Sequence, residues 1–130
     1  MFFNKEKGAI RAGNVSGTQW DESNIGPTSV AFGWNTMASG DRSTAFGSST
    51  VASGGWSTAM GGGNIALGSY STAMGRETVA SGAYSTAMGY KSVASGDYSI
   101  AMGIKCIRKL HYCIRISYKS RGKHFNSDGA

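Results

Sequence analysis

The residues with the most reactive side chains lie near the end of the sequence. The stretch CIRKLHYCIR, residues 106–115, contains both cysteines, one of the two histidines and three Lys/Arg residues. Two thiolates and an imidazole could bind a metal ion, and two thiols could form a redox pair. A single C-x6-C with one intervening histidine, His111, has neither the number nor the spacing of ligands that a zinc site needs. We therefore expect no metal site.

Catalytic chemistry finds no support in the rest of the chain. Residues 26–103 contain no histidine and no cysteine, and their few acidic residues are scattered, so no base–nucleophile pair can be proposed. The triple glycine at 61–63 could suggest a phosphate-binding loop, but no GK[S/T] follows it. We expect a protein that is not an enzyme and that needs no cofactor.

The net charge of +6 suggests a nucleic-acid partner until the charges are placed along the chain. Residues 1–103 carry six Lys/Arg and six Asp/Glu, whereas residues 104–130 carry seven Lys/Arg and only Asp128. Because the body of the chain is neutral, we expect no nucleic-acid binding. No apolar run approaches the roughly 20 residues of a membrane span, so we expect no membrane contact. Residues 1–13 lack the apolar core of a secretory signal, and an export signal and anchor would lie outside this sequence.

The body of the chain is a repeat of seven residues. The pentapeptide STAMG begins at 57, 71 and 85, with STAFG at 43, SVAFG at 29 and SIAMG at 99. Gly occupies every seventh position from 26 to 103, Ala stands two residues before each Gly from 31 to 101, and Ser, Thr or Asn stands two residues before each Ala. ASG recurs at 38, 52, 80 and 94, so the finer period is 14 residues.

The spacing of glycine excludes a coiled coil. Each interior Gly would cost a helix about 1 kcal/mol, and the apolar seam of a heptad repeat is missing. Short strands separated by Gly-led turns fit instead, because Gly reaches positive φ freely. We expect an all-β protein, a parallel β-solenoid with two strands in each 14-residue coil. Six coils at about 4.8 Å would form a rod roughly 29 Å long.

The side chains of one coil alternate between its two faces. Thr72 and Met74 share one face, and Val79 with Ser81 forms a smaller pair in the second strand, so we expect these pairs to fill a thin core. The Ala column must stay small either inside the coil or against a partner subunit, and the sequence leaves both open. Because such a core buries little apolar surface, we expect self-association.

The SVAFG, STAMG and ASG units over residues 26–103 resemble the YadA-like head repeats of trimeric autotransporter adhesins. The resemblance implies a left-handed parallel β-roll, a homotrimer, and a non-enzymatic adhesin at the cell surface or outer membrane that binds a host surface or an extracellular matrix protein. Residues 1–25 form a lead-in segment. A shaft or receptor-binding segment of a phage-like tail fibre is the alternative. The repeat positions expected to be structural are Gly33, Gly47, Gly61, Gly75, Gly89, Gly103, Ala31, Ala45, Ala59, Ala73, Ala87 and Ala101.

Two columns of side chains are candidates for binding. Trp56, Tyr70, Tyr84 and Tyr98 are 14 residues apart, so they would stack along the surface, either as an adhesive stripe or as a self-stabilising ladder. A second column contains hydroxyls, which either bond the backbone of the turns or order water at the surface as ice-binding solenoids do. Its members include Ser43, Ser57, Ser71, Ser85 and Ser99.

Residues 104–130 depart from the repeat but keep its spacing, since Cys-Ile-Arg at 106 recurs at 113. The codons GCA-TCA-GGN for Ala-Ser-Gly, read one base out of phase, encode Cys-Ile-Arg or Ser-Ile-Arg. One hypothesis is therefore that this basic tail is an out-of-frame reading of further repeats. Such a tail would have no selected fold and would be disordered or form only incidental strands. A genuine basic extension is the alternative, and the coding DNA in the other frames distinguishes them.

Overall fold

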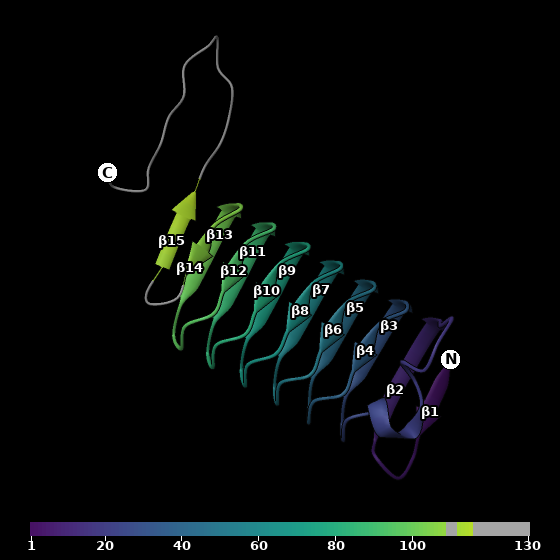
Figure 1. Ribbon diagram of the computed structural model, residues 1–130. Helices are drawn as coiled ribbons and strands as arrows, with labels where there is room; N and C mark the ends of the chain where they lie inside the picture. Colours follow the sequence, from purple (N-terminus) through teal and green to yellow (C-terminus); the bar gives the residue numbers. More distant parts are fainter. Residues whose placement is uncertain (109–111, 116–130) are drawn as a thin grey trace.

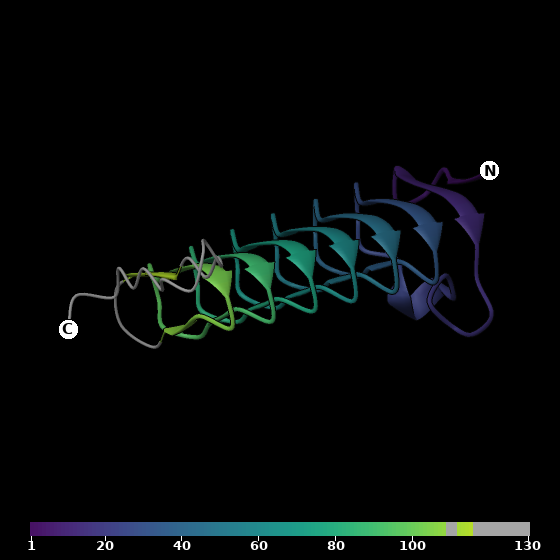
Figure 2. The ribbon, with the colours of Figure 1, turned by 90° about the horizontal axis from the view of Figure 1, so that it is seen from above.

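The computed structural model describes residues 1–108 and 112–115, and these form a single stack of coils along one axis (Figures 1 and 2). Each coil contributes one long strand and one short strand. The long strands are β3 Val30–Trp34, β5 Thr44–Ser48, β7 Thr58–Gly62, β9 Thr72–Arg76, β11 Thr86–Tyr90 and β13 Ile100–Ile104. The short strands are β4 Met37–Ala38, β6 Val51–Ala52, β8 Ile65–Ala66, β10 Val79–Ala80, β12 Val93–Ala94 and β14 Ile107–Arg108.

The two kinds of strand form two separate sheets, which are parallel except for the first strand, β1. The nine-stranded sheet has the order β1-β2-β3-β5-β7-β9-β11-β13-β15, where β1 is Phe2–Asn4, β2 is Ala9–Asn14 and β15 is Tyr112–Arg115. The six-stranded sheet has the order β14-β12-β10-β8-β6-β4. From β3 to β13 every residue pairs with the residue 14 positions later, so Ala73 pairs with Ala87 and Met74 with Met88. The prediction of an all-β solenoid with two strands per 14-residue coil and about six coils is confirmed.

The interior of the solenoid is filled by the smallest side chains of the repeat. All eleven repeat alanines from Ala31 to Ala101 have no exposed surface, and neither does the column of Ser, Thr and Asn side chains that precedes them. Thr72, Met74 and Val79 are only partly buried, and Ser81 is exposed. The expectation that these pairs fill the core is therefore wrong. The larger apolar side chains point outward, and the Ala column lies inside the coil beside the buried Ser, Thr and Asn side chains.

The repeat glycines have a different role from the one that the sequence suggests. Gly75 has φ +112° but lies inside β9, where a Cβ would meet the carbonyl oxygen of Gly89 at 2.0 Å. Gly82 begins a turn without a positive φ, and a Cβ there would meet the carbonyl oxygen of Gly96 at 2.1 Å. The repeat therefore needs Gly because adjacent coils stack backbone against backbone, and in the long strands also because φ is positive.

The first residues close the start of the solenoid. The strand β1 pairs antiparallel with β2, and β2 is already part of the parallel sheet through its pairing with β3. Arg11 lies in the Ala column, opposite Ala31, and is fully buried. Its guanidinium donates to the carbonyl oxygens of Ile10, Ser29 and Ala38 at 2.9, 3.1 and 2.9 Å, and to Oγ of Ser29 at 2.8 Å. Burial lowers the pKa of Arg11.

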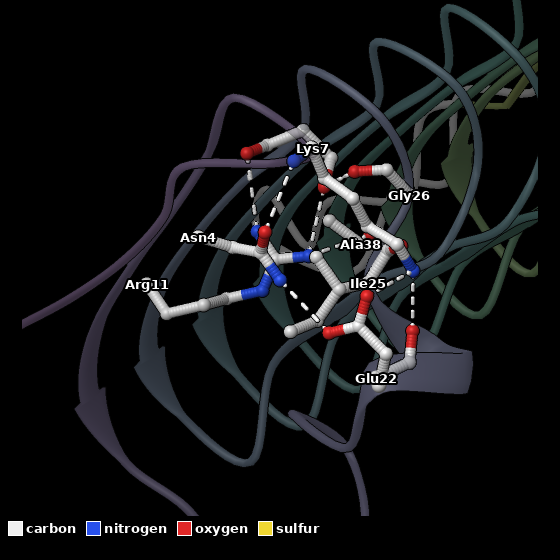
Figure 3. Close-up of polar contacts among 8 residues, drawn as sticks. Asn4, Lys7, Arg11, Glu22, Ile25, Gly26 and Ala38 are labelled. Carbon is white, nitrogen blue, oxygen red and sulfur yellow. Dashed lines mark hydrogen bonds and ion pairs between the residues drawn. The ribbon is translucent and has the colours of Figure 1, made fainter.

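A second cation completes this N-terminal cap (Figure 3). Lys7 Nζ donates to the backbone carbonyls of Glu22 and Ile25, and it forms an ion pair with the Glu22 carboxylate at 3.2 Å. Glu22 begins the short 3-10 helix η1, Glu22–Asn24. These contacts hold the segment before the first repeat against the N-terminal end of the solenoid. The predicted domain boundary at residue 26 stays a prediction.

The described part of the tail continues both sheets. The strand β14 pairs with β12, and β15 pairs with β13 with Cys113 opposite Ala101, so the last coil is two residues shorter than the others. A disulfide joins Cys106 to Cys113 across the coil, with a Cα–Cα distance of 6.1 Å. The out-of-frame hypothesis stays a prediction, and the remainder of the tail, 109–111 and 116–130, lies outside the described residues.

Candidate functional site

The four predicted aromatic residues form a continuous aromatic ladder along one edge of the solenoid. The ring centroids of Trp56 and Tyr70 are 5.0 Å apart, those of Tyr70 and Tyr84 are 4.9 Å apart, and those of Tyr84 and Tyr98 are 5.1 Å apart. The rings are nearly parallel, with interplanar angles of 6°, 4° and 2°. The prediction that these side chains stack is confirmed, whereas their role in adhesion stays a prediction.

The backbone holds the ladder in place. Each ring belongs to the turn that leads from a short strand into a long one, and each ring residue donates its N–H to a carbonyl in the preceding coil. Tyr70 donates to Gly55, Tyr84 to Ser69 and Tyr98 to Ala83, each at 2.8 Å. The spacing of the rings is therefore fixed by the spacing of the coils.

The ring residues adopt a backbone conformation that does not favour aromatic side chains. Their φ angles are between +56° and +59°, which costs a non-glycine residue roughly 1–2 kcal/mol. An aromatic pair returns about 0.5–1.5 kcal/mol beyond its area burial. Glu77 and Lys91 adopt the same conformation in turns at the opposite edge, so the solenoid imposes it on both edges, and at the ladder the stacking offsets part of its cost.

The two ends of the ladder differ. At one end the guanidinium of Arg42 lies 5.1 Å from the ring centroid of Trp56, and Asp41 holds Arg42 with an ion pair at 2.7 Å. At the other end Tyr98 is 73% exposed, compared with 45–50% for the other three rings. Asp97 precedes Tyr98, and its Oδ1 accepts the N–H of Ala83 at 2.9 Å.

A row of small residues accompanies the ladder. Gly55, Ser69 and Ala83 each precede a ring residue, and their carbonyls accept the backbone N–H groups of the ring residues in the next coil. We call these three the small-residue column. Asp41 and Asp97 occupy the equivalent positions one coil before and one coil after it. Sequence reasoning missed this arrangement, although the 14-residue spacing of all five positions could have revealed it.

The hydroxyl column does not lie at the surface. Ser43, Ser57, Ser71, Ser85 and Ser99 are all fully buried, so the ice-binding interpretation of this column is wrong. Ser43 Oγ donates to the carbonyl of Gly40 at 2.8 Å, as expected for a bond to the turn. The other four Oγ atoms have no hydrogen-bond partner among the described residues. A small side chain is needed at these positions because they line the same interior as the alanines.

The outer face of the nine-stranded sheet carries the largest apolar side chains of the repeat. They form one column in register, which we call the outer apolar column: Phe32, Phe46, Met60, Met74, Met88 and Met102. Phe46 is 37% exposed and Met60 is 40% exposed. An apolar row of this length along an exposed sheet face is typical of a surface that contacts another protein.

The cysteines are joined to each other and are not available as metal ligands. Cys106 is buried at a position of the Ser/Thr/Asn column, and Cys113 is partly buried against the alanine core. Residues 1–108 and 112–115 contain no cluster of three or more His, Cys, Asp or Glu side chains that could hold a metal ion. Within the same residues, no helix has the length and apolarity to span a membrane.

The stack of similar coils, with equivalent side chains aligned in columns, places this protein in the class of β-solenoid repeat modules. Comparison with family models identifies the repeat: the YadA head domain repeat matches residues 25–50, 52–78 and 80–104. The chain therefore belongs to the YadA head repeat family, as its STAMG and ASG units suggested. This family is a structural adhesin family without enzymatic activity, and its members are typical of the heads of trimeric autotransporter adhesins. A search of curated proteins returns no match.

Proposed function

We propose that this chain is the head module of a homotrimeric adhesin at the cell surface, anchored to the outer membrane by segments outside this sequence. The observation that carries the proposal is the coincidence of a YadA head repeat with an outer apolar column that runs the length of the rod and is only partly buried in the single chain. In this proposal the solenoid is a left-handed parallel β-roll. Adhesion to host cells or extracellular matrix is its biological role.

The distribution of apolar side chains supports the proposed trimer. Between Arg11 at one end and Cys106 at the other, the interior of the coils buries methyl groups and small polar side chains, which contribute little hydrophobic stabilisation. Phe46 and Met60 lie outside this interior and keep more than a third of their surface exposed. Three copies that pack their outer apolar columns together around a common axis would bury the surface that the single chain leaves open.

The outward edges of such a trimer would carry the aromatic ladder. Tyr and Trp are enriched among residues that dominate binding energies, and the ladder is held rigidly at half exposure. A preordered surface of this kind binds with little loss of side-chain entropy. We assign the adhesive contact to this edge and the subunit contact to the outer face of the nine-stranded sheet.

The test is a binding assay on the full chain. Fluorescently labelled protein is applied to a panel of immobilised extracellular matrix proteins and to fixed host cells, and saturable binding to at least one surface is expected. The double variant Tyr70→Asn/Tyr84→Asn should lose most of that binding, because Asn tolerates positive φ but cannot stack. Ser49→Asn is the matched control, since Ser49 is exposed and has φ +54° at the opposite edge. Equal binding by the double variant and the control would refute the assignment to the ladder, and no binding to any surface would refute the adhesive function.

A further inference from the structure

The aromatic ladder does not offer ring faces to a ligand along most of its length. Each inner ring is covered on both faces by its neighbours at 4.9–5.1 Å, and Arg42 covers the outer face of Trp56. The half of each ring that remains exposed is therefore mainly its edge. A sugar ring or a single aromatic group that stacks on a face would find no place between the rungs.

The surface beside the ladder is open because the small-residue column places no large side chains there. At Gly55 an added Cβ would meet only one atom within 4 Å, the carbonyl oxygen of Asp41 at 3.9 Å, so the space beside the rings is open there. Ser69 and Ala83 continue the row with small side chains, and Ser69 is exposed. Four ring edges thus stand beside a row of small residues in a straight line about 15 Å long, given the spacing of roughly 5 Å between rungs.

The charges at the two ends of this row are unequal. The Asp41 carboxylate is neutralised by Arg42 at 2.7 Å. The Asp97 carboxylate is exposed and has no ion pair among the described residues, and one of its oxygens is held against the small-residue column by the N–H of Ala83. A molecule lying along the row would find aromatic ring edges beneath its length and, at one end, the exposed Asp97 carboxylate, which has no ion pair among the described residues.

We infer that the ladder and the small-residue column together form a binding site for an elongated, flat aromatic cation that lies parallel to the solenoid axis. Such a molecule can contact several ring edges at once, whereas a compact ligand can contact only one or two. The positive charge of the ligand lies beside the Asp97 carboxylate. The rigid spacing of the coils means that the site is formed before the ligand binds, so little ordering entropy is lost. The inference rests on the proposed trimer only because the edge must lie outside the subunit contact.

The probe for this site is thioflavin T, an elongated aromatic cation whose fluorescence rises when its rings are held planar. We expect saturable fluorescence enhancement with the full chain. Congo red, a flat dianion of similar shape, should bind at least about tenfold more weakly, equivalent to about 1.4 kcal/mol. This preference opposes the net charge of +6, which by itself would favour the dianion. Equal or tighter binding of Congo red would overturn the inference.

Three variants locate the site. Gly55→Leu fills the open space beside the rings and should weaken thioflavin T binding at least about fivefold, and Asp97→Asn should weaken it by a similar factor. Ser81→Leu is the control, because it introduces the same side chain at an exposed position directly after β10, in the column where Leu67 already stands. It should leave binding unchanged. If Gly55→Leu binds the dye like the wild type, or if Ser81→Leu weakens binding equally, the inference is wrong.

Sedimentation and far-UV circular dichroism of each variant show whether its fold and assembly are retained. Dye binding and adhesion are separate readouts on the same protein. If the wild-type chain binds thioflavin T but no matrix protein or host cell, only the proposed function is refuted. If it adheres but does not bind thioflavin T, only this inference is refuted.

Discussion

The two glycines Gly82 and Gly55 allow a direct test of why the repeat contains glycine. Both lie in the turns that lead into long strands, and neither has a positive φ, so an alanine meets no left-handed backbone strain at either place. An added Cβ at Gly82 would lie 2.1 Å from the carbonyl oxygen of Gly96 in the next coil, whereas ordinary contact begins at 3.4 Å. At Gly55 the nearest atom is 3.9 Å away. The substitution Gly→Ala should therefore have opposite effects at the two positions.

The size of the destabilisation by Gly82→Ala follows from the movement of the adjacent coil that the added methyl group requires. To accept Gly82→Ala, the coils must separate locally by more than 1 Å, which breaks backbone bonds such as Gly82 N–H to the Ala94 carbonyl, now 3.3 Å. Overpacking costs about 1–3 kcal/mol, and each lost hydrogen bond costs about 1 kcal/mol. We expect Gly82→Ala to lower the free energy of unfolding by about 2–4 kcal/mol. Gly55→Ala should leave it unchanged or raise it by about 0.4–1 kcal/mol, because alanine restricts the unfolded chain.

Thermal unfolding followed by circular dichroism measures the difference. Both variants are compared with the wild type at one protomer concentration, because the melting temperature of an oligomer depends on concentration. Gly82→Ala should melt about 10 °C lower than Gly55→Ala, given the entropy of unfolding of a chain of this size. If the two variants melt together, the stacking of adjacent backbones does not explain the glycines.

Three further perturbations probe other parts of the fold. Ala73→Leu should cost at least about 3 kcal/mol in urea unfolding because the interior has no room, whereas Met74→Leu on the outer face should cost less than about 1.5 kcal/mol. Arg11→Ala leaves buried carbonyls without donors, so hydrogen exchange should accelerate in the first coil and not in the middle of the rod. Cys106→Ser opens the disulfide and should destabilise the last coil by about 2–3 kcal/mol. The wild type, denatured without reductant, should show no reactive thiol, and two reactive thiols would contradict the disulfide.

The period of the repeat was sufficient to predict the solenoid. A Gly every seventh residue and a finer repeat of 14 leave few folds that can place each residue type in an equivalent environment, and the strands and their register agree with that reading. The stacking of Trp56 on Tyr70 also follows directly from spacing, because residues one coil apart become neighbours in any solenoid.

The direction of the side chains could not be predicted from the same pattern. Alternation shows that Ala73 and Met74 point to opposite faces, but it does not show which face is inside. The distance between the two sheets decides this, and only the folded structure contains it. The larger side chains were assigned to the core because apolar residues are usually buried, an expectation that fails when the interior is too narrow for them.

The N-terminal cap was missed for a different reason. Arg11 stands two residues before Gly13 and therefore occupies the Ala position of the repeat. The longer segment between Gly13 and the first regular repeat hides this equivalence in the sequence. A buried guanidinium in an alanine column has no counterpart elsewhere in the repeat. Its partners Ser29 and Ala38 are 18 and 27 residues away, so the contact becomes visible only once β2 pairs with β3.

The proposed trimer is tested most directly by sedimentation equilibrium of the full chain at micromolar concentration, together with the variant Met60→Glu. We expect a wild-type particle of three times the 13.5 kDa chain mass. We also expect dissociation of the variant, because a carboxylate in the outer apolar column would be buried without a partner at the subunit contact. A folded wild-type monomer, or a variant that remains as fully assembled as the wild type, would contradict the proposed trimer.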